Sequence, residues 1–157
     1  MNEDELFEIA SRFREAIEES DLSADPRCSE GASRLEGFPD GACAEVVELL
    51  GLFLREEFDI DDLVKWHGII KENGEWIGSH YWLRHNEIII DITADQFELG
   101  APSIIAEVGS KFHSNYAHDL KEQVDTMFWE HQSDWMKPLY EVVTAKYFEL
   151  ENSENSE

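Results

Sequence analysis

The chain has 157 residues, of which 42% are hydrophobic and 11% aromatic, and its formal net charge at pH 7 is −24. The aromatic content predicts a packed core rather than a disordered chain, and the length suits one domain. The excess of 36 Asp and Glu over 12 Lys and Arg argues against binding to nucleic acid or to an anionic membrane, whereas a basic protein partner suits it.

The N-terminal sequence has no basic region followed by an apolar run, so it does not resemble a signal peptide. No segment is long and apolar enough to span a bilayer. We therefore expect a cytoplasmic protein. In that reducing compartment its two cysteines, Cys28 and Cys43, should stay unpaired.

Two helices are predicted in the first third of the chain. Residues 3–20 carry apolar side chains at helical spacing with acids between them. Residues 21–41 contain two prolines and three glycines and predict an irregular segment. Residues 42–57 again show helical spacing, and the apolar side chains cover most of this helix.

The middle of the chain predicts an antiparallel sheet of three or four strands. Strand-like runs, rich in β-branched and aromatic residues, occupy residues 62–72, 79–84 and 87–93. Asn73-Gly74 is a strong hairpin signal after the first run. His85-Asn86 separates the other two runs and predicts a second turn.

After residue 102 the pattern returns to helix. The candidate helices are residues 103–110, 117–132 and 137–149. Residues 149–157 hold four carboxylates and no base, which predicts a solvated tail. Together these elements predict a single α+β domain over residues 1–148, followed by an acidic flexible tail.

Cys43 opens the second predicted helix, directly after Gly41-Ala42. In the first turn of a helix, the unpaired backbone N–H groups and the positive end of the dipole favour the nucleophilic thiolate. Gly41 lets a substrate carbonyl approach the backbone, where N–H groups can form an oxyanion hole. The alternative is that Cys43 is a small buried hydrophobic residue. Cys28 lies in the irregular segment and is interpreted as incidental, with a regulatory thiol as the alternative.

The predicted turn at His85-Asn86 brings a histidine and a carboxylate together. In that register His80 lies directly opposite Asp91, and opposed side chains point to the same face with Cβ atoms ~5 Å apart. Asp91 interrupts an apolar run, and a carboxylate there needs a partner. An ordinary His–Asp cross-strand pair is the structural alternative, and Asp95 is the alternative acid.

The Gly-x-Cys helix start and the His-x-Trp pair followed by an Asp on the next strand resemble bacterial papain-like and transglutaminase-like proteins. The resemblance covers roughly residues 38–97. Similar triads occur in peptidases that remove lasso-peptide leaders and in toxin domains that deamidate glutamine. The resemblance implies a papain/transglutaminase-like fold, in which a helix bearing the Cys packs on a small antiparallel sheet bearing the His and Asp. By position, Cys43 would be the nucleophile, His80 the general base and Asp91 the orienting acid.

Two features depart from the papain pattern. No Gln precedes the cysteine to complete the oxyanion hole, and Ala44 replaces the usual aromatic residue after it. Gln96, just after the last predicted strand, is a candidate substitute donor. Trp82 shares a strand face with His80 by period two and is a candidate wall of the substrate site, or else a core residue.

These patterns predict a thiol-dependent acyl-transfer enzyme, either a peptidase, a glutamine deamidase or a transamidase. Its substrate would be a protein or peptide carboxamide, from a basic partner. No cofactor is predicted, because the sequence has no phosphate-binding glycine motif, no CxxC and no His pair at metal-ligand spacing. The alternatives are a catalytically inactive acidic binding protein, of an inhibitor, immunity or nucleic-acid-mimic type, and a structural subunit.

Overall fold

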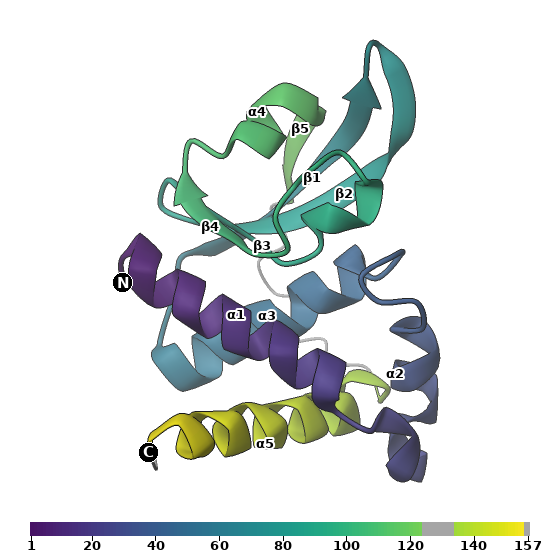
Figure 1. Cartoon of the computed structure of the whole chain (residues 1–157), viewed down its shortest axis with the longest axis vertical. Coiled ribbons are helices and arrows are strands. Elements are labelled where there is room, and N and C mark those ends of the chain that lie inside the picture. The colour runs from purple at the N-terminus through teal and green to yellow at the C-terminus, as the bar shows by residue number, and fades with distance from the viewer. Residues whose placement is uncertain (124–133, 156–157) are drawn as a thin grey trace.

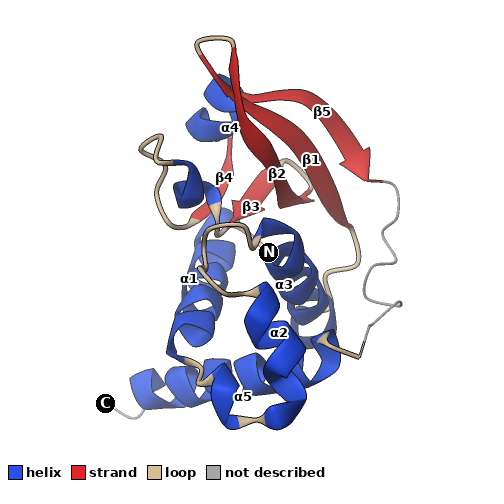
Figure 2. Ribbon diagram, turned by 90° about the vertical axis from the view of Figure 1, so that its right-hand side faces the viewer, coloured by secondary structure: helices blue, strands red, loops and turns tan. Residues whose placement is uncertain are grey.

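The computed structural model describes residues 1–123 and 134–155. Helices gather at one end of the molecule, and an antiparallel sheet with short helical segments forms the other end (Figure 1, Figure 2). The helices are α1 (Glu3–Glu19), α2 (Ser29–Arg34), α3 (Cys43–Phe58), α4 (Lys111–Tyr116) and α5 (Met136–Asn155). Short 3-10 helices are η1 (Leu22–Ala24), η2 (Pro26–Cys28) and η3 (Ala94–Phe97).

The sheet contains five strands within the described residues, in the spatial order β4–β3–β2–β1–β5. The strands are β1 (Leu63–Glu72), β2 (Glu75–His85), β3 (Ile88–Asp91), β4 (Ile105–Val108) and β5 (Ala117–Gln123). The fold class is α+β, as the sequence predicts. In the described part of the chain, no helix combines the length and the apolar character needed to cross a membrane.

Helix α1 follows directly from its sequence. The side chain of Asn2 caps it by accepting a hydrogen bond from the backbone N–H of Glu5, and three acids occupy its first turn, where the dipole favours them. Its apolar stripe is buried, and Phe13 lies in an aromatic cluster with Phe53 of α3 and Tyr147 of α5. The three long helices therefore share one core.

The sheet separates this helical core from a second, smaller one. Leu83 and Ile90 face the helices, whereas Trp82 faces the side covered by α4 and η3. Helix α3 packs against β2, and its buried side chains run from its first residue, Cys43, to Leu54. The N-terminus of α3 is thereby placed beside β2.

The first hairpin forms as predicted, with Asn73 and Gly74 in left-handed conformations, at φ of 52° and 80°. The second hairpin turns one residue later than predicted, at Asn86-Glu87. Asn86 adopts the left-handed conformation, with φ of 53°, which asparagine tolerates better than most residues. His85 is thus the last residue of β2 and pairs with the first residue of β3.

This change makes the predicted register wrong. Leu83 pairs with Ile90, so continuing the register sets Asp91 across from Trp82 rather than His80. His80 and Asp91 therefore meet along a diagonal, which is within reach of long side chains.

The segments predicted as helices at 103–110 and 117–132 are wrong where the structure describes them. They contain strands β4 and β5, and residues 124–132 of the second prediction lie outside the described residues. Both strands lie at sheet edges, paired with β3 and β1 respectively. Pairing with a distant strand overrides the local helical pattern.

The last predicted helix, at 137–149, is present but longer. Residues 149–155 continue α5, where the sequence predicts a flexible tail, although the side chains of residues 152–155 are exposed, as a solvated tail requires. Arg12 of α1 explains the difference, because it forms ion pairs with Glu151 and Glu154 and contacts Tyr147. A cation from another element, which local composition does not reveal, partly neutralises this acidic turn.

Candidate functional site

Cys43 is the first residue of α3, and only 9% of its surface is exposed. Its sulfur forms hydrogen bonds with the His80 side chain and with the backbone N–H of Tyr81, the next residue on β2. Burial alone would raise the pKa of the thiol, but the hydrogen bond and charge of His80, with the N–H of Tyr81, lower it below its usual value. The arrangement therefore favours the thiolate.

His80 is 0% exposed, and its Nε2 lies 2.6 Å from Oδ2 of Asp91. Because Nε2 serves Asp91, the other ring nitrogen, Nδ1, is the one that serves Cys43. Burial alone would lower the pKa of His80, but the charge and hydrogen bond of Asp91, together with Cys43, raise it to about 9. A raised imidazole pKa and a lowered thiol pKa describe a thiolate–imidazolium pair.

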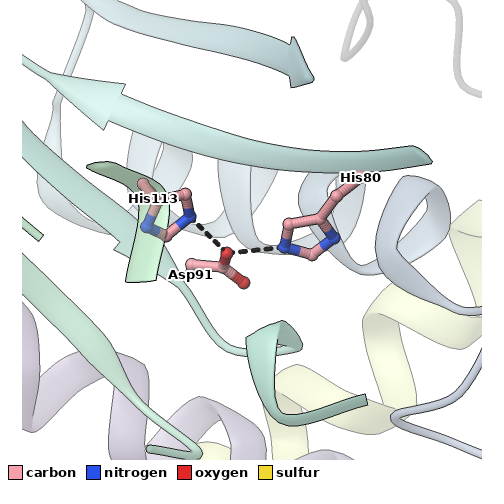
Figure 3. A group of neighbouring side chains, drawn as sticks. All are labelled: His80, Asp91 and His113. Atoms are coloured by element: carbon pink, nitrogen blue, oxygen red, sulfur yellow. Dashed lines mark hydrogen bonds and ion pairs between the residues drawn. The ribbon is translucent and has the colours of Figure 1, made fainter. Parts of the chain in front are cut away.

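Asp91 ends β3 and is buried. Its Oδ2 accepts hydrogen bonds from Nε2 of His80 and from Nε2 of His113, at 2.8 Å, while Oδ1 accepts the backbone N–H of Thr93 at 3.0 Å. Figure 3 shows both imidazole rings pointing a nitrogen at this carboxylate. Burial alone would raise the pKa of Asp91, but these donors and the charge of His80 hold it well below its usual value, so Asp91 is ionised.

Sequence reasoning missed His113. It lies on α4, is buried, and joins the site although 22 residues separate it from Asp91. Its Nδ1 lies 2.7 Å from Oγ of Ser110, the N-cap of α4. The only local signal is this Ser-x-x-His spacing, which by itself predicts a helix start and no role in a site.

Gln96 of η3 lies on the Cys43 side of the His80 ring. Its Oε1 accepts the backbone N–H of Gly41 at 3.1 Å, and its Nε2 donates to the carbonyl of Thr93 at 2.9 Å. The same Nε2 lies 3.4 Å from Nδ1 of His80. The candidate oxyanion donor is thus next to the reacting pair, whereas the N–H of Gly41 is already engaged by Gln96.

The remaining predicted residues have structural positions. Trp82 is buried in the smaller core, with its ring centroid 5.7 Å from that of His80 and 4.7 Å from that of His113, so it covers the imidazoles from the core side. Asp95 does not replace Asp91, because both of its oxygens bind the guanidinium of Arg14, at 2.7 and 2.8 Å.

Cys28 belongs to the 3-10 helix η2 rather than to the predicted irregular segment. It is 0% exposed, burial raises the pKa of its thiol, and both cysteines are free. The pKa of the Cys28 thiol is thus shifted in the opposite direction to that of Cys43. Cys28 therefore provides an internal reference for thiol reactivity.

Among the described residues, one group has the spacing of metal ligands, namely His80, Asp91 and His113, whose candidate atoms lie within 4.8 Å of one another. The N–O separations of 2.6 and 2.8 Å are those of hydrogen bonds. Ligands of a tetrahedral zinc ion, each about 2.0–2.1 Å from the metal, would stand roughly 3.3 Å apart. Cys43 cannot join such a centre, because it faces the opposite nitrogen of His80. The geometry fits a hydrogen-bonded relay better than a metal centre.

No protein-family model, curated protein or solved structure matches this chain.

Proposed function

We propose that this protein is a thiol-dependent acyl-transfer enzyme of the papain/transglutaminase type, with Cys43 as nucleophile, His80 as general acid and base, and Asp91 as orienting acid. The observation that carries the proposal is the continuous series of hydrogen bonds from the Cys43 sulfur through His80 to the ionised, buried Asp91. A structural His–Asp pair alone would not account for a thiol with a lowered pKa at the N-terminus of a helix.

The reaction follows from this geometry. The Cys43 thiolate attacks the carbonyl carbon of a carboxamide, and the proton on Nδ1 of His80 passes to the leaving amine or ammonia as the C–N bond breaks. The resulting thioester is attacked by water or by an amine, which gives its proton to His80. Cys43 then leaves as the thiolate. Asp91 stays ionised throughout and stabilises the imidazolium.

Two donors are available for the negative oxygen of the intermediate. The backbone N–H of Cys43 is at the first position of α3, where helical N–H groups have no intrahelical acceptor. The amide Nε2 of Gln96 lies beside Nδ1 of His80. In this proposal Gln96 takes the place of the glutamine that papain-type proteases carry before the cysteine.

Peptide cleavage, glutamine deamidation and transamidation share these steps. The net charge of −24 favours a basic protein or peptide, because a basic segment is attracted to the acidic surface before it reaches the site. We therefore propose a carboxamide within a Lys- and Arg-rich segment as the substrate.

The test is to trap the acyl-enzyme. The protein is mixed with a library of basic, glutamine-containing peptides and quenched in acid after short times, and mass spectrometry locates any thioester. Release of ammonia with an intact peptide indicates deamidation, and a shortened peptide indicates cleavage. The proposal predicts an acyl adduct on Cys43.

The matched variants are Cys43→Ala and Cys28→Ala. The adduct should be absent from the first and retained in the second, because Cys28 lies outside the site. If the folded wild-type protein forms no adduct with any peptide, the acyl-transfer proposal is wrong. The acidic surface would then favour the alternative of an inactive binding protein for basic partners.

A further inference from the structure

Oδ2 of Asp91 is shared between two imidazoles. His80 donates to it from β2 at 2.6 Å, and His113 donates from α4 at 2.8 Å. Oδ1 is held separately by Thr93, through the backbone N–H at 3.0 Å and the hydroxyl at 3.5 Å. Both oxygens of the carboxylate are therefore held by hydrogen bonds. Its orientation toward His80 depends partly on His113, which makes no contact with Cys43 among the described residues.

The proton on Nε2 of His113 follows from its contact with Asp91. Ionised Asp91 has no proton to donate, so Nε2 of His113 must carry one and donate it. Oγ of Ser110, 2.7 Å from Nδ1 of His113, can donate its hydroxyl proton to that nitrogen. Ser110 also caps α4, accepting the backbone N–H of His113 at 3.4 Å. Ser110 thus caps the helix and also offers its hydroxyl to the ring nitrogen that Asp91 does not engage.

From this arrangement we infer that His113 is a positioning residue of the proposed site, a neutral Nε2–H imidazole that holds Asp91 in the orientation that supports the His80 imidazolium. The inference rests on the proposed function and extends the Cys43–His80–Asp91 series by a fourth member. His113 takes no proton from the substrate and touches no reacting atom. It acts only through Asp91.

The surroundings of His113 contain few other charges. Its ring packs against Trp82, with centroids 4.7 Å apart, and against Phe112 of its own helix, at 5.0 Å. In residues 1–123 and 134–155, the titratable groups that face it are Asp91 and, with ring centroids 6.3 Å apart, His80. His113 and Arg84 of β2 both line a cavity of about 220 Å³. This cavity gives room for a side chain of similar size at position 113.

The test compares His113→Gln with His113→Leu. Glutamine places an amide N–H close to the position of Nε2 and keeps the donor to Asp91, whereas leucine keeps the bulk and removes the donor. His85→Leu is the matched control. Like His113, His85 is a buried histidine that pairs with a carboxylate, but it lies at the end of β2 and its partner, Asp62 at 2.6 Å, is outside the site. The readout is the titration of His80 by NMR of ¹⁵N-labelled imidazoles, with alkylation of Cys43 measured alongside.

We expect His113→Leu to lower the titration midpoint of His80 by about one pH unit and to slow alkylation of Cys43 at pH 6 about tenfold. His113→Gln should stay within about twofold of wild type, and His85→Leu should leave the His80 midpoint unchanged. A folded His113→Leu variant with an unchanged His80 midpoint would overturn the inference, and so would a His85→Leu variant that shifts the midpoint equally.

If His113→Leu does not fold, the ¹⁵N NMR spectrum of the wild-type imidazoles tests the inference instead. A neutral His113 with its proton on Nε2 supports the inference, and a proton on Nδ1 or a charged ring overturns it. These measurements are independent of turnover. If no acyl adduct forms on Cys43 but the His80 midpoint still responds to His113, the proposed function fails and the positioning role stands.

Discussion

At the scale of single residues, the site depends on one buried carboxylate. A charge in this position is costly to bury unless it is fully hydrogen-bonded, and Asp91 receives bonds from two imidazoles and the backbone of Thr93. The sequence did indicate that Asp91 needed a partner, because it interrupts an apolar run. It could not indicate His113, whose contact with Asp91 exists only after α4 packs on the sheet.

The change Asp91→Asn tests the carboxylate at nearly constant shape. The amide has one oxygen for three donors and no charge, so the pKa of His80 should fall and that of Cys43 should rise. We expect the midpoint of the Cys43 thiol titration to rise by about one pH unit or more. Because less thiolate is then present at pH 6, alkylation of Cys43 at that pH should slow at least about tenfold. The rate is measured by mass spectrometry on protein whose fold is checked by circular dichroism.

Asp62→Asn is the control for this substitution, because it removes the other His–Asp pair of β2 at 2.6 Å, between Asp62 and His85. It should leave the Cys43 rate unchanged. Equal slowing in both variants, or no slowing in a folded Asp91→Asn protein, would refute the role given to Asp91.

At the scale of elements, α1 holds the segment that follows β3. The side chain of Arg14 is 11% exposed and binds both oxygens of Asp95. It also donates to the carbonyls of Ile92 and Ser103, each at 3.0 Å. Gln96 is the next residue after Asp95. A helix from the N-terminal end of the chain thereby fixes the loop that carries the candidate oxyanion donor.

Arg14→Met should therefore weaken both the fold and the site. It leaves two carbonyls and a carboxylate without their donor, and we expect a loss of unfolding free energy on the order of 2–3 kcal/mol. Urea unfolding followed by tryptophan fluorescence measures it. Arg27→Met is the comparison, because Arg27 is 64% exposed and its ion pairs lie in solvent. The decrease in unfolding free energy should therefore be much smaller for Arg27→Met than for Arg14→Met. Equal losses in the two variants would contradict the bracing role of Arg14.

The elements also show where sequence reasoning succeeded and failed. Helices α1, α3 and α5 were predictable because each has a sustained apolar period, and the Asn73-Gly74 hairpin was predictable from its turn residues. The second hairpin was shifted by one residue because Asn86, and not His85, takes the left-handed position. His80 and Asp91 still meet, since their side chains share a sheet face in either register. Strands β4 and β5 were missed because their partners are distant strands.

At the scale of the whole molecule, the two cores place the site at their boundary. Cys43 comes from the helical side and Tyr81 of β2 offers it a backbone N–H, whereas His80 and Trp82 face the smaller core under α4. The reacting pair therefore forms only when helices and sheet are docked. The net charge of −24 attracts basic segments to the molecule, so these segments are its substrates in the proposal.

The most direct measurement is the pH dependence of iodoacetamide alkylation at each cysteine, read by mass spectrometry on the native protein and on His80→Ala. The lowered pKa of Cys43 and the His80 pKa of about 9 predict a thiolate–imidazolium pair that persists well below the ordinary thiol pKa of 9.0 and is lost as pH rises through 9. Cys43 should thus react rapidly near pH 6 and lose that reactivity in His80→Ala, while buried Cys28 stays slow. A Cys43 that reacts like an ordinary thiol, with a rate unchanged by His80→Ala, would contradict the pair and the enzyme built on it.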